Sequence, residues 1–190
     1  MTRLAIFASG SGSNAENLIR HFAGSPDIQV ALVLSNRATA FVLERAQRLD
    51  IPTVVFNKEE FYNTDKVLSI LREYEIGHVV LAGFLWLVPD NLLSAFPGRI
   101  VNIHPALLPK YGGKGMYGMH VHEAVVANGE TETGITIHTV DAEYDRGEIL
   151  FQARCTVLPA DTPETVAAKV HELEHQYFPK VVEKWVKDTR

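Results

Sequence analysis

Asn102 and His104 are the two residues whose types and spacing most directly suggest a reaction. They stand two positions apart in an apolar segment that is typical of a strand, and alternate side chains of a strand point to the same face. An amide that donates a hydrogen bond, beside an imidazole that donates or moves a proton, suits a reaction that builds negative charge on a carbonyl oxygen. Because single histidines often have structural roles, spacing alone leaves catalysis and structure equally open.

Three acidic residues, Asp141, Glu143 and Asp145, follow His138 in a segment between two apolar stretches. A carboxylate close to His104 would raise the pKa of the imidazole, orient the ring and relay a proton through water. The alternative is a solvated acidic turn.

The segment Ser9–Asn14 is rich in glycine and serine and lies directly after an expected strand and before an expected helix. Free backbone amides and the helix dipole favour an anion there, so the segment is a candidate phosphate site, or else only a tight turn with a good helix cap. It also fits the dinucleotide-binding pattern G-x-G-x-x-A, with Gly10, Gly12 and Ala15 at the three small positions. The ribose-binding acid of that pattern is missing, because Ser35–Arg37 occupies its place; Arg37 leaves an NADP site as a weaker alternative.

His171 and His175 match the zinc-protease pattern H-E-x-x-H on an expected helix. The extended pattern requires a glycine where this chain has Phe178, and few residues follow that could supply a third ligand. The sequence therefore disfavours zinc hydrolysis, and we expect no metal site.

Short apolar stretches alternate with amphipathic ones in the first half of the chain, which predicts parallel strands joined by helices. A glycine-rich segment follows, and then a short helix and two further strands that extend the sheet in an antiparallel sense. We expect strands over 4–8, 28–34, 53–56, 78–82, 100–103, 134–140 and 148–157, and helices over 14–22, 39–49, 57–74 and 120–128. A long closing helix begins near Asp161, capped by Thr162–Glu164, and we expect Pro179 to kink it or end its first part.

The chain has 190 residues and one cysteine, and 18 basic against 23 acidic residues give a net charge of −5. This length favours a single domain over residues 1–190, and the charge disfavours a general nucleic-acid or anionic-membrane binder. No segment is apolar over the roughly 18 residues that a membrane helix needs, and the N-terminus has no signal peptide. We expect a cytoplasmic protein that is a monomer or a homodimer.

Four segments together resemble the phosphoribosylglycinamide formyltransferases, a branch of the folate-dependent formyltransferase family. They are Ser9–Asn14, Leu81–Phe84, Val101–Pro109 and Asp145–Gly147, and they span most of the chain. The segment that contains Asn102 and His104 is similar to one shared by all these formyltransferases, so it identifies the chemistry better than the acceptor of the formyl group.

The resemblance implies a Rossmann-like formyltransferase fold and transfer of a formyl group from 10-formyltetrahydrofolate to glycinamide ribonucleotide in purine synthesis, without metal. Both substrates are small molecules. By motif, Asn102, His104 and Asp145 correspond to the catalytic set of the family. Residues of the acceptor site are Gly12, Ser13, Asn14 and Glu174, and those of the folate site are Leu85, Trp86, Leu87, Val88, Asn102, His138, Asp141 and Asp145.

Two features depart from the family pattern. Trp86 stands where the family often has an arginine, and the segment Lys110–Met119 is longer than expected and suggests a lid, with Lys110 and Lys114 as possible ligands of a phosphate or of the folate tail. Other functions stay open: hydrolysis of formyltetrahydrofolate, transfer to a different amine, or a non-catalytic nucleotide-binding module.

Overall fold

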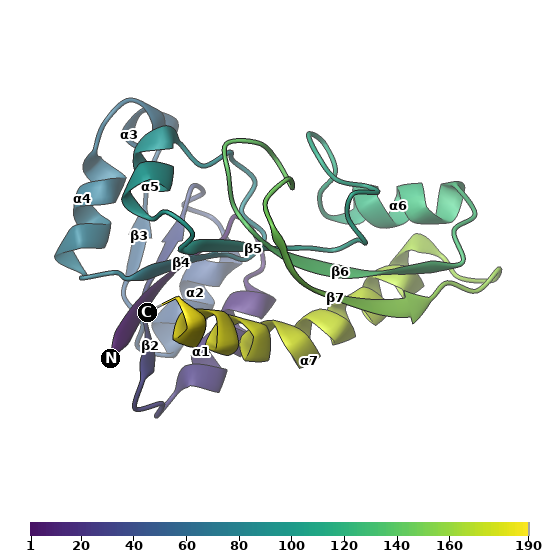
Figure 1. Ribbon diagram of the computed structural model, residues 1–190, viewed down its shortest axis with the longest axis horizontal. Coiled ribbons are helices and arrows are strands. Elements are labelled where there is room, and N and C mark those ends of the chain that lie inside the picture. Colours follow the sequence, from purple (N-terminus) through teal and green to yellow (C-terminus); the bar gives the residue numbers. More distant parts are fainter. Residues whose placement is uncertain (190) are drawn as a thin grey trace.

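A sheet of seven strands forms the centre of the protein (Figure 1). The computed structural model describes residues 1–189. The strands lie in the order β3-β2-β1-β4-β5-β6-β7, with β1 to β5 parallel and β6 and β7 each antiparallel to the preceding strand. Their bounds are β1 Thr2–Phe7, β2 Ile28–Ser35, β3 Thr53–Val55, β4 His78–Leu81, β5 Ile100–His104, β6 Glu132–Thr139 and β7 Ile149–Thr156. The predicted fold class is confirmed.

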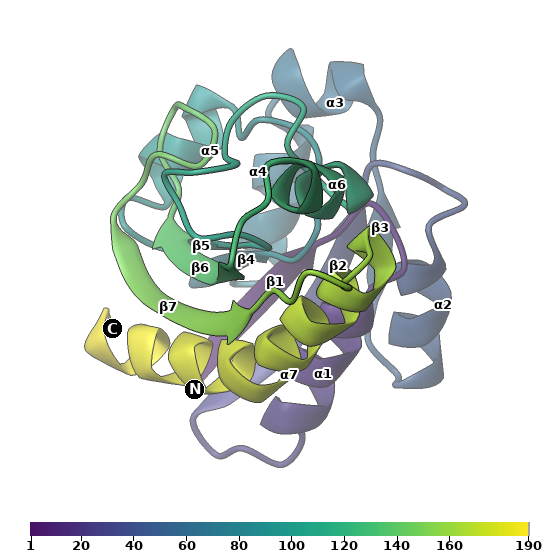
Figure 2. The ribbon, with the colours of Figure 1, turned by 90° about the vertical axis from the view of Figure 1, so that its right-hand side faces the viewer.

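Helices cover both faces of this sheet, as predicted (Figure 2). The apolar faces of α1, α2 and α7 pack on one side, and those of α3, α4 and α5 pack on the other. The helix bounds are α1 Ser13–Phe22, α2 Phe41–Arg48, α3 Lys58–Tyr62, α4 Lys66–Glu73, α5 Asp90–Ala95, α6 Met119–Ala127 and α7 Pro163–Asp188.

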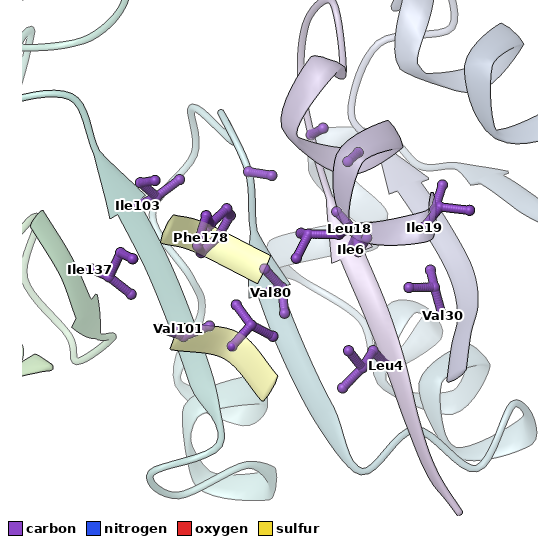
Figure 3. Close-up of a cluster of buried hydrophobic side chains, with 14 of the residues drawn as sticks. Leu4, Ile6, Leu18, Ile19, Val30, Val80, Val101, Ile103, Ile137 and Phe178 are labelled. Atoms are coloured by element: carbon purple, nitrogen blue, oxygen red, sulfur yellow. The ribbon is translucent and has the colours of Figure 1, made fainter. Parts of the chain in front are cut away.

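Successive residues of β1 enter two different hydrophobic cores. Leu4 and Ile6 pack with Leu18 of α1 and Phe178 of α7 (Figure 3), whereas Phe7 faces the opposite core. All five side chains are at most 1% exposed. Since burial of such a side chain contributes roughly 1.5–3 kcal/mol, these contacts fix β1 rigidly between the two helical layers.

The carboxyl ends of β1 and β4 meet at the point where the order of the strands reverses. Ser9, directly after β1, joins the neighbouring loops: its N–H donates to the Gly83 carbonyl at 3.0 Å, and its Oγ accepts from the Leu85 N–H at 3.1 Å. The same hydroxyl donates to Asn36 Oδ1 at 2.6 Å. In open α/β sheets, ligands bind at such a reversal, so this edge of the sheet is where a site is expected.

The single helix predicted over 57–74 is wrong, because the structure has two helices there. A capping box between Asn57 and Glu60 starts α3, as the asparagine indicated. Thr64 then ends α3: its hydroxyl donates to the Glu60 carbonyl at 2.9 Å and accepts from the Lys66 N–H at 3.2 Å. Helix α5 was not predicted, because six residues are too few to show a helical period.

Helix α7 continues through Pro179, so of the two expected effects of this proline, a kink or an end, the structure excludes the end. Proline has no N–H, and the carbonyl four residues earlier, that of His175, therefore lacks its usual helical donor. The side chain of Asn17 in α1 donates to this carbonyl at 3.0 Å. Pro179 itself is buried with Phe178, so tertiary packing holds the helix together across the missing bond.

Gly12, at the start of α1, lies directly against Val42 of α2. Its φ is 76°, in the left-handed region, and a Cβ there would lie 2.4 Å from Val42 Cβ and Cγ2. The Val42 N–H donates to the Gly10 carbonyl at 3.1 Å, which fixes α2 against this turn. Both the backbone conformation and the space exclude any other residue.

We expect Gly12→Ala to lower the free energy of unfolding more than Gly24→Ala does. Gly24 has nearly the same φ, 77°, but open space around its Cα. Gly24→Ala therefore reports backbone strain alone, roughly 1–2 kcal/mol, whereas Gly12→Ala adds a clash of about 1–3 kcal/mol with Val42. Urea unfolding of both variants measures the difference. Equal losses would mean that α2 moves away from the turn without cost.

Candidate active site

A cavity of about 760 Å³ opens at the carboxyl ends of β1, β4 and β5. Its volume lies in the range of pockets that bind small organic molecules. It brings together twelve of the thirteen site residues predicted from the sequence: Gly12, Ser13, Asn14, Leu85, Trp86, Leu87, Val88, Asn102, His104, His138, Asp145 and Glu174. Asp141 is not part of the lining. It is exposed, and its carboxylate accepts from the Glu143 N–H at 2.8 Å, so it shapes the loop.

Asn102 and His138 lie opposite each other on the paired strands β5 and β6. Asn102 Nδ2 is 3.2 Å from His138 Nε2, and His138 Nδ1 is 2.8 Å from the Thr139 carbonyl. A carbonyl only accepts, so neutral His138 carries its hydrogen on Nδ1 and its Nε2 accepts from the amide. One hydrogen of Asn102 Nδ2 is thereby engaged, and the other is free to face the cavity.

His104 is 3% exposed and is held by residues of two loops. Its Nε2 lies 2.7 Å from the Tyr111 carbonyl, and its Nδ1 lies 3.5 Å from Asp145 Oδ2. Nε2 therefore carries the hydrogen, which leaves Nδ1 to gain or lose a proton next to the carboxylate. Burial holds the pKa of His104 below its usual 6.5, and Asp145 and the Tyr111 carbonyl oppose that shift only in part. At neutral pH the ring is mostly uncharged.

Asp145 lies between the two histidines, with Oδ1 3.5 Å from His138 Nε2. Its Oδ2 also accepts from the Gly113 N–H at 3.0 Å. Burial alone would raise the pKa of this carboxyl, but the His138 and His104 rings in their protonated forms, together with the Gly113 N–H, outweigh it and leave the pKa below its usual 3.8. Asp145 is therefore an anion in a largely enclosed site.

The backbone around this carboxylate is constrained. Asp145 and Tyr111 both have a φ of 56°, in a region that non-glycine residues seldom adopt, and both hold His104. Two residues after Asp145 the chain needs a glycine, because a Cβ on Gly147 would lie 1.6 Å from the Thr139 carbonyl oxygen. Strained backbone of this kind often marks a functional site.

The glycine-rich turn Ser9–Asn14 and helix α7 form one end of the cavity. Asn14 Nδ2 donates to Glu174 Oε2 at 2.9 Å, and His171 Nδ1 lies 3.0 Å from the same oxygen. Behind the turn, Arg45 Nε donates to the Ser11 carbonyl at 2.8 Å. That carbonyl is thus turned toward α2, while the start of α1 lies at the cavity, an arrangement suited to an anion.

Aromatic side chains line the end of the cavity near Leu85–Val88. Trp86 lies 6.1 Å from Phe56 and 6.0 Å from Tyr62, measured between ring centroids. The Tyr62 hydroxyl donates to the Leu87 carbonyl at 2.9 Å, which fixes the loop. Trp86 thus both packs against the core and faces the cavity.

The glycine-rich segment Lys110–Met119 lines one wall. Lys114 is a lining residue, whereas Lys110 Nζ pairs with Glu130 at 3.1 Å and is held away from the cavity. His122 is a lining residue that the sequence did not single out. It is 6% exposed, and burial holds its pKa below 6.5. Its spacing from His120 matches no recognisable ligand set and gave no sign of the cavity.

Among residues 1–189 no group of three or more histidine, cysteine or acidic residues is arranged to hold a metal ion. His171 and His175, the zinc-like pair, lie 4.1 Å apart between ring centroids, and His171 Nδ1 is engaged by Glu174. None of the described helices is long and apolar enough to cross a membrane.

Comparison with known proteins identifies the family. Residues 2–182 match the sequence profile described as Formyl transferase. The chain belongs to the formyl transferase family. It is 42% identical over 186 residues to the chloroplastic phosphoribosylglycinamide formyltransferase of Arabidopsis thaliana, which covers 95% of this chain and 64% of that protein. It is 35% identical over 187 residues to the phosphoribosylglycinamide formyltransferase of Bacillus subtilis, which covers 96% of this chain and 93% of that one.

Solved structures of the family have the same fold. The phosphoribosylglycinamide formyltransferase of Bacillus halodurans superimposes with a TM-score of 0.87 at 37% identity and covers all of this chain and 97% of that one. The chain spans less than two thirds of the two plant relatives, 64% of the A. thaliana protein and 60% of its Vigna unguiculata counterpart.

We expect Asp145→Asn to lower the pKa of His104 further below 6.5. The negative charge of the carboxylate favours the protonated imidazole and so raises the pKa of His104. Without this charge, the lowering of the pKa by burial is larger. NMR titration of the histidine Cε1–H resonances measures this change. His171, whose pKa is raised by its bond to Glu174, is the internal control, and its midpoint should stay the same. An unchanged or raised midpoint for His104 would mean that the two groups do not interact as this geometry implies.

Proposed function

We propose that residues 1–190 form one formyltransferase domain that moves the formyl group of 10-formyltetrahydrofolate to the amino group of N1-(5-phospho-D-ribosyl)glycinamide, in de novo purine synthesis. The observation that carries this proposal is that one cavity contains Asn102, His104 and Asp145 at its centre and the Gly12–Asn14 turn with Glu174 at one end. The kinship with phosphoribosylglycinamide formyltransferases supports the choice of acceptor.

The reaction forms a bond between the acceptor amine and the formyl carbon and breaks the bond from that carbon to N10 of the folate. Negative charge develops on the formyl oxygen in between. The free hydrogen of Asn102 Nδ2 would donate to that oxygen, because His138 already fixes the orientation of the amide. Such a donor needs no reorganisation when the charge appears.

The attacking amine loses a proton, and N10 of the folate gains one. His104 Nδ1 is uncharged at neutral pH and lies beside the Asp145 anion, so the pair can take up a proton and release it again. The bond from Nε2 to the Tyr111 carbonyl keeps the ring oriented throughout. Asp145 stabilises the imidazolium while it exists, a role that requires the low pKa of the carboxyl.

The phosphate of the acceptor would bind at the start of α1, on the backbone and side chains of Gly12, Ser13 and Asn14. Glu174 lies between this turn and the catalytic residues. Its carboxylate would bind the acceptor close to the reacting amine of that molecule. Binding of a remote phosphate positions the reacting amine without contacting it.

The folate would lie along Leu85–Val88 and the aromatic side chains behind this loop, with Asn102, His138 and Asp145 at its formyl group. A flat pterin ring fits a wall of this composition. Asp141 would act indirectly, through the loop that carries Asp145. The proposed chemistry uses no metal, and it involves two small-molecule substrates and neither nucleic acid nor membrane. A cytoplasmic location and a monomeric or dimeric state remain predictions.

The test of this function is the release of tetrahydrofolate from a 10-formyl folate, followed spectrophotometrically with and without glycinamide ribonucleotide. We expect turnover that depends on the acceptor. Release at the same rate without acceptor would mean a hydrolase instead, and no release with this acceptor would exclude the proposed reaction.

We expect Asn102→Ala to lower kcat about 10²–10³-fold, the usual effect of removing one donor to a developing oxyanion. Gln47→Ala is the control, since it removes a side-chain amide that bonds only to Thr53 on the surface. That variant should keep the wild-type rate. A loss of less than about tenfold in Asn102→Ala would contradict the assigned role.

A further inference from the structure

Two asparagines of α1, one helical turn apart, bond to two adjacent residues of α7. Asn14 Nδ2 donates to the Glu174 carboxylate at 2.9 Å, and Asn17 Nδ2 donates to the His175 carbonyl at 3.0 Å. The first pair lies at the cavity, and the second lies just behind it on the helix surface. The helices run side by side here, as Figure 2 shows.

The second of these bonds exists because of Pro179. A carbonyl inside a helix normally accepts from the N–H four residues later, and for His175 that residue is proline. The carbonyl therefore has accepting capacity that the helix does not use. The Asn17 side chain donates to this carbonyl from α1. The missing hydrogen bond within α7 is therefore replaced by a hydrogen bond between the two helices.

We propose that Asn17, bonded to the carbonyl that Pro179 leaves free, is a positioning residue that holds Glu174 at the acceptor end of the cavity. Glu174 adjoins His175 in α7, so fixing the backbone of His175 against α1 also fixes the distance from Glu174 to Asn14. This inference rests on the proposed function, which assigns this end of the cavity to the acceptor. Asn17 itself would touch neither substrate.

The variant Asn17→Leu keeps the approximate volume of the side chain and removes the donor. We expect the KM for glycinamide ribonucleotide to rise about two- to tenfold, the range that one hydrogen bond supplies. The KM for the formyl folate should stay unchanged, and kcat should change less than the acceptor KM. A general loss of structure would instead affect both substrates.

His21→Ala is the matched control. His21 also joins α1 to α7, through a contact of 3.0 Å from Nε2 to Glu183, but further along both helices from the cavity. If the acceptor KM rises equally in both variants, the effect is loose helix packing and the positioning role of Asn17 is overturned.

Pro179→Ala tests the part played by proline. It supplies an N–H for the His175 carbonyl, so we expect the loss of Asn17 to raise the acceptor KM less in Pro179→Ala than in the wild type. Effects that simply multiply in the double variant would show that the two residues act independently, contrary to the proposal.

A readout without substrates separates this inference from the proposed function. The Asn14 side-chain amide donates to Glu174 across the two helices, so its NMR resonances report whether α7 keeps Glu174 at this position. We expect these resonances to shift in Asn17→Leu and to stay the same in His21→Ala. That result in a protein without acceptor-dependent turnover would refute the function and keep the positioning role, whereas unmoved resonances with unchanged KM values would refute the role.

Discussion

The pairing of β1 with β4 at the centre of the sheet is the constraint on which the rest of the structure depends. Both strands are buried on two faces, so their register and direction are fixed by packing from both helical layers. Their carboxyl ends consequently meet at one edge, and the loops that follow must share that space. Ser9 binds these loops together, and the cavity forms where they diverge.

Placing His104 and Asp145 in that enclosed space carries a cost, which the surrounding backbone offsets. Two buried ionisable groups are tolerated only when hydrogen bonds and opposite charge replace water. The Tyr111 carbonyl accepts from His104, and the Gly113 N–H donates to Asp145. The left-handed conformations of Tyr111 and Asp145 are the local strain that this arrangement requires. The same groups that keep the pair stable also give each residue the charge state its proposed role needs.

The cavity has two chemically different ends. Polar groups of α1 and α7 surround one end, and Leu85–Val88 with the aromatic side chains behind them form the other. Two dissimilar molecules bound at these ends would meet at Asn102 and His104. Each end is rigid for its own reason: side-chain hydrogen bonds join α1 to α7, and the contact of Tyr62 with the Leu87 carbonyl fixes the aromatic wall.

The sequence by itself determined the alternation of strands and helices, the shared face of Asn102 and His104, and the need for glycine in the turn before α1, because these depend on local periodicity and backbone conformation. The motif resemblance also led to the site residues, of which Asp141 alone lies outside the cavity lining. Only the tertiary structure decided that His104 bonds to the Tyr111 carbonyl, that His122 faces the cavity and that α7 passes through Pro179. Those features depend on partners far away in the chain, and local sequence carries no signal of which distant group will satisfy a buried polar atom.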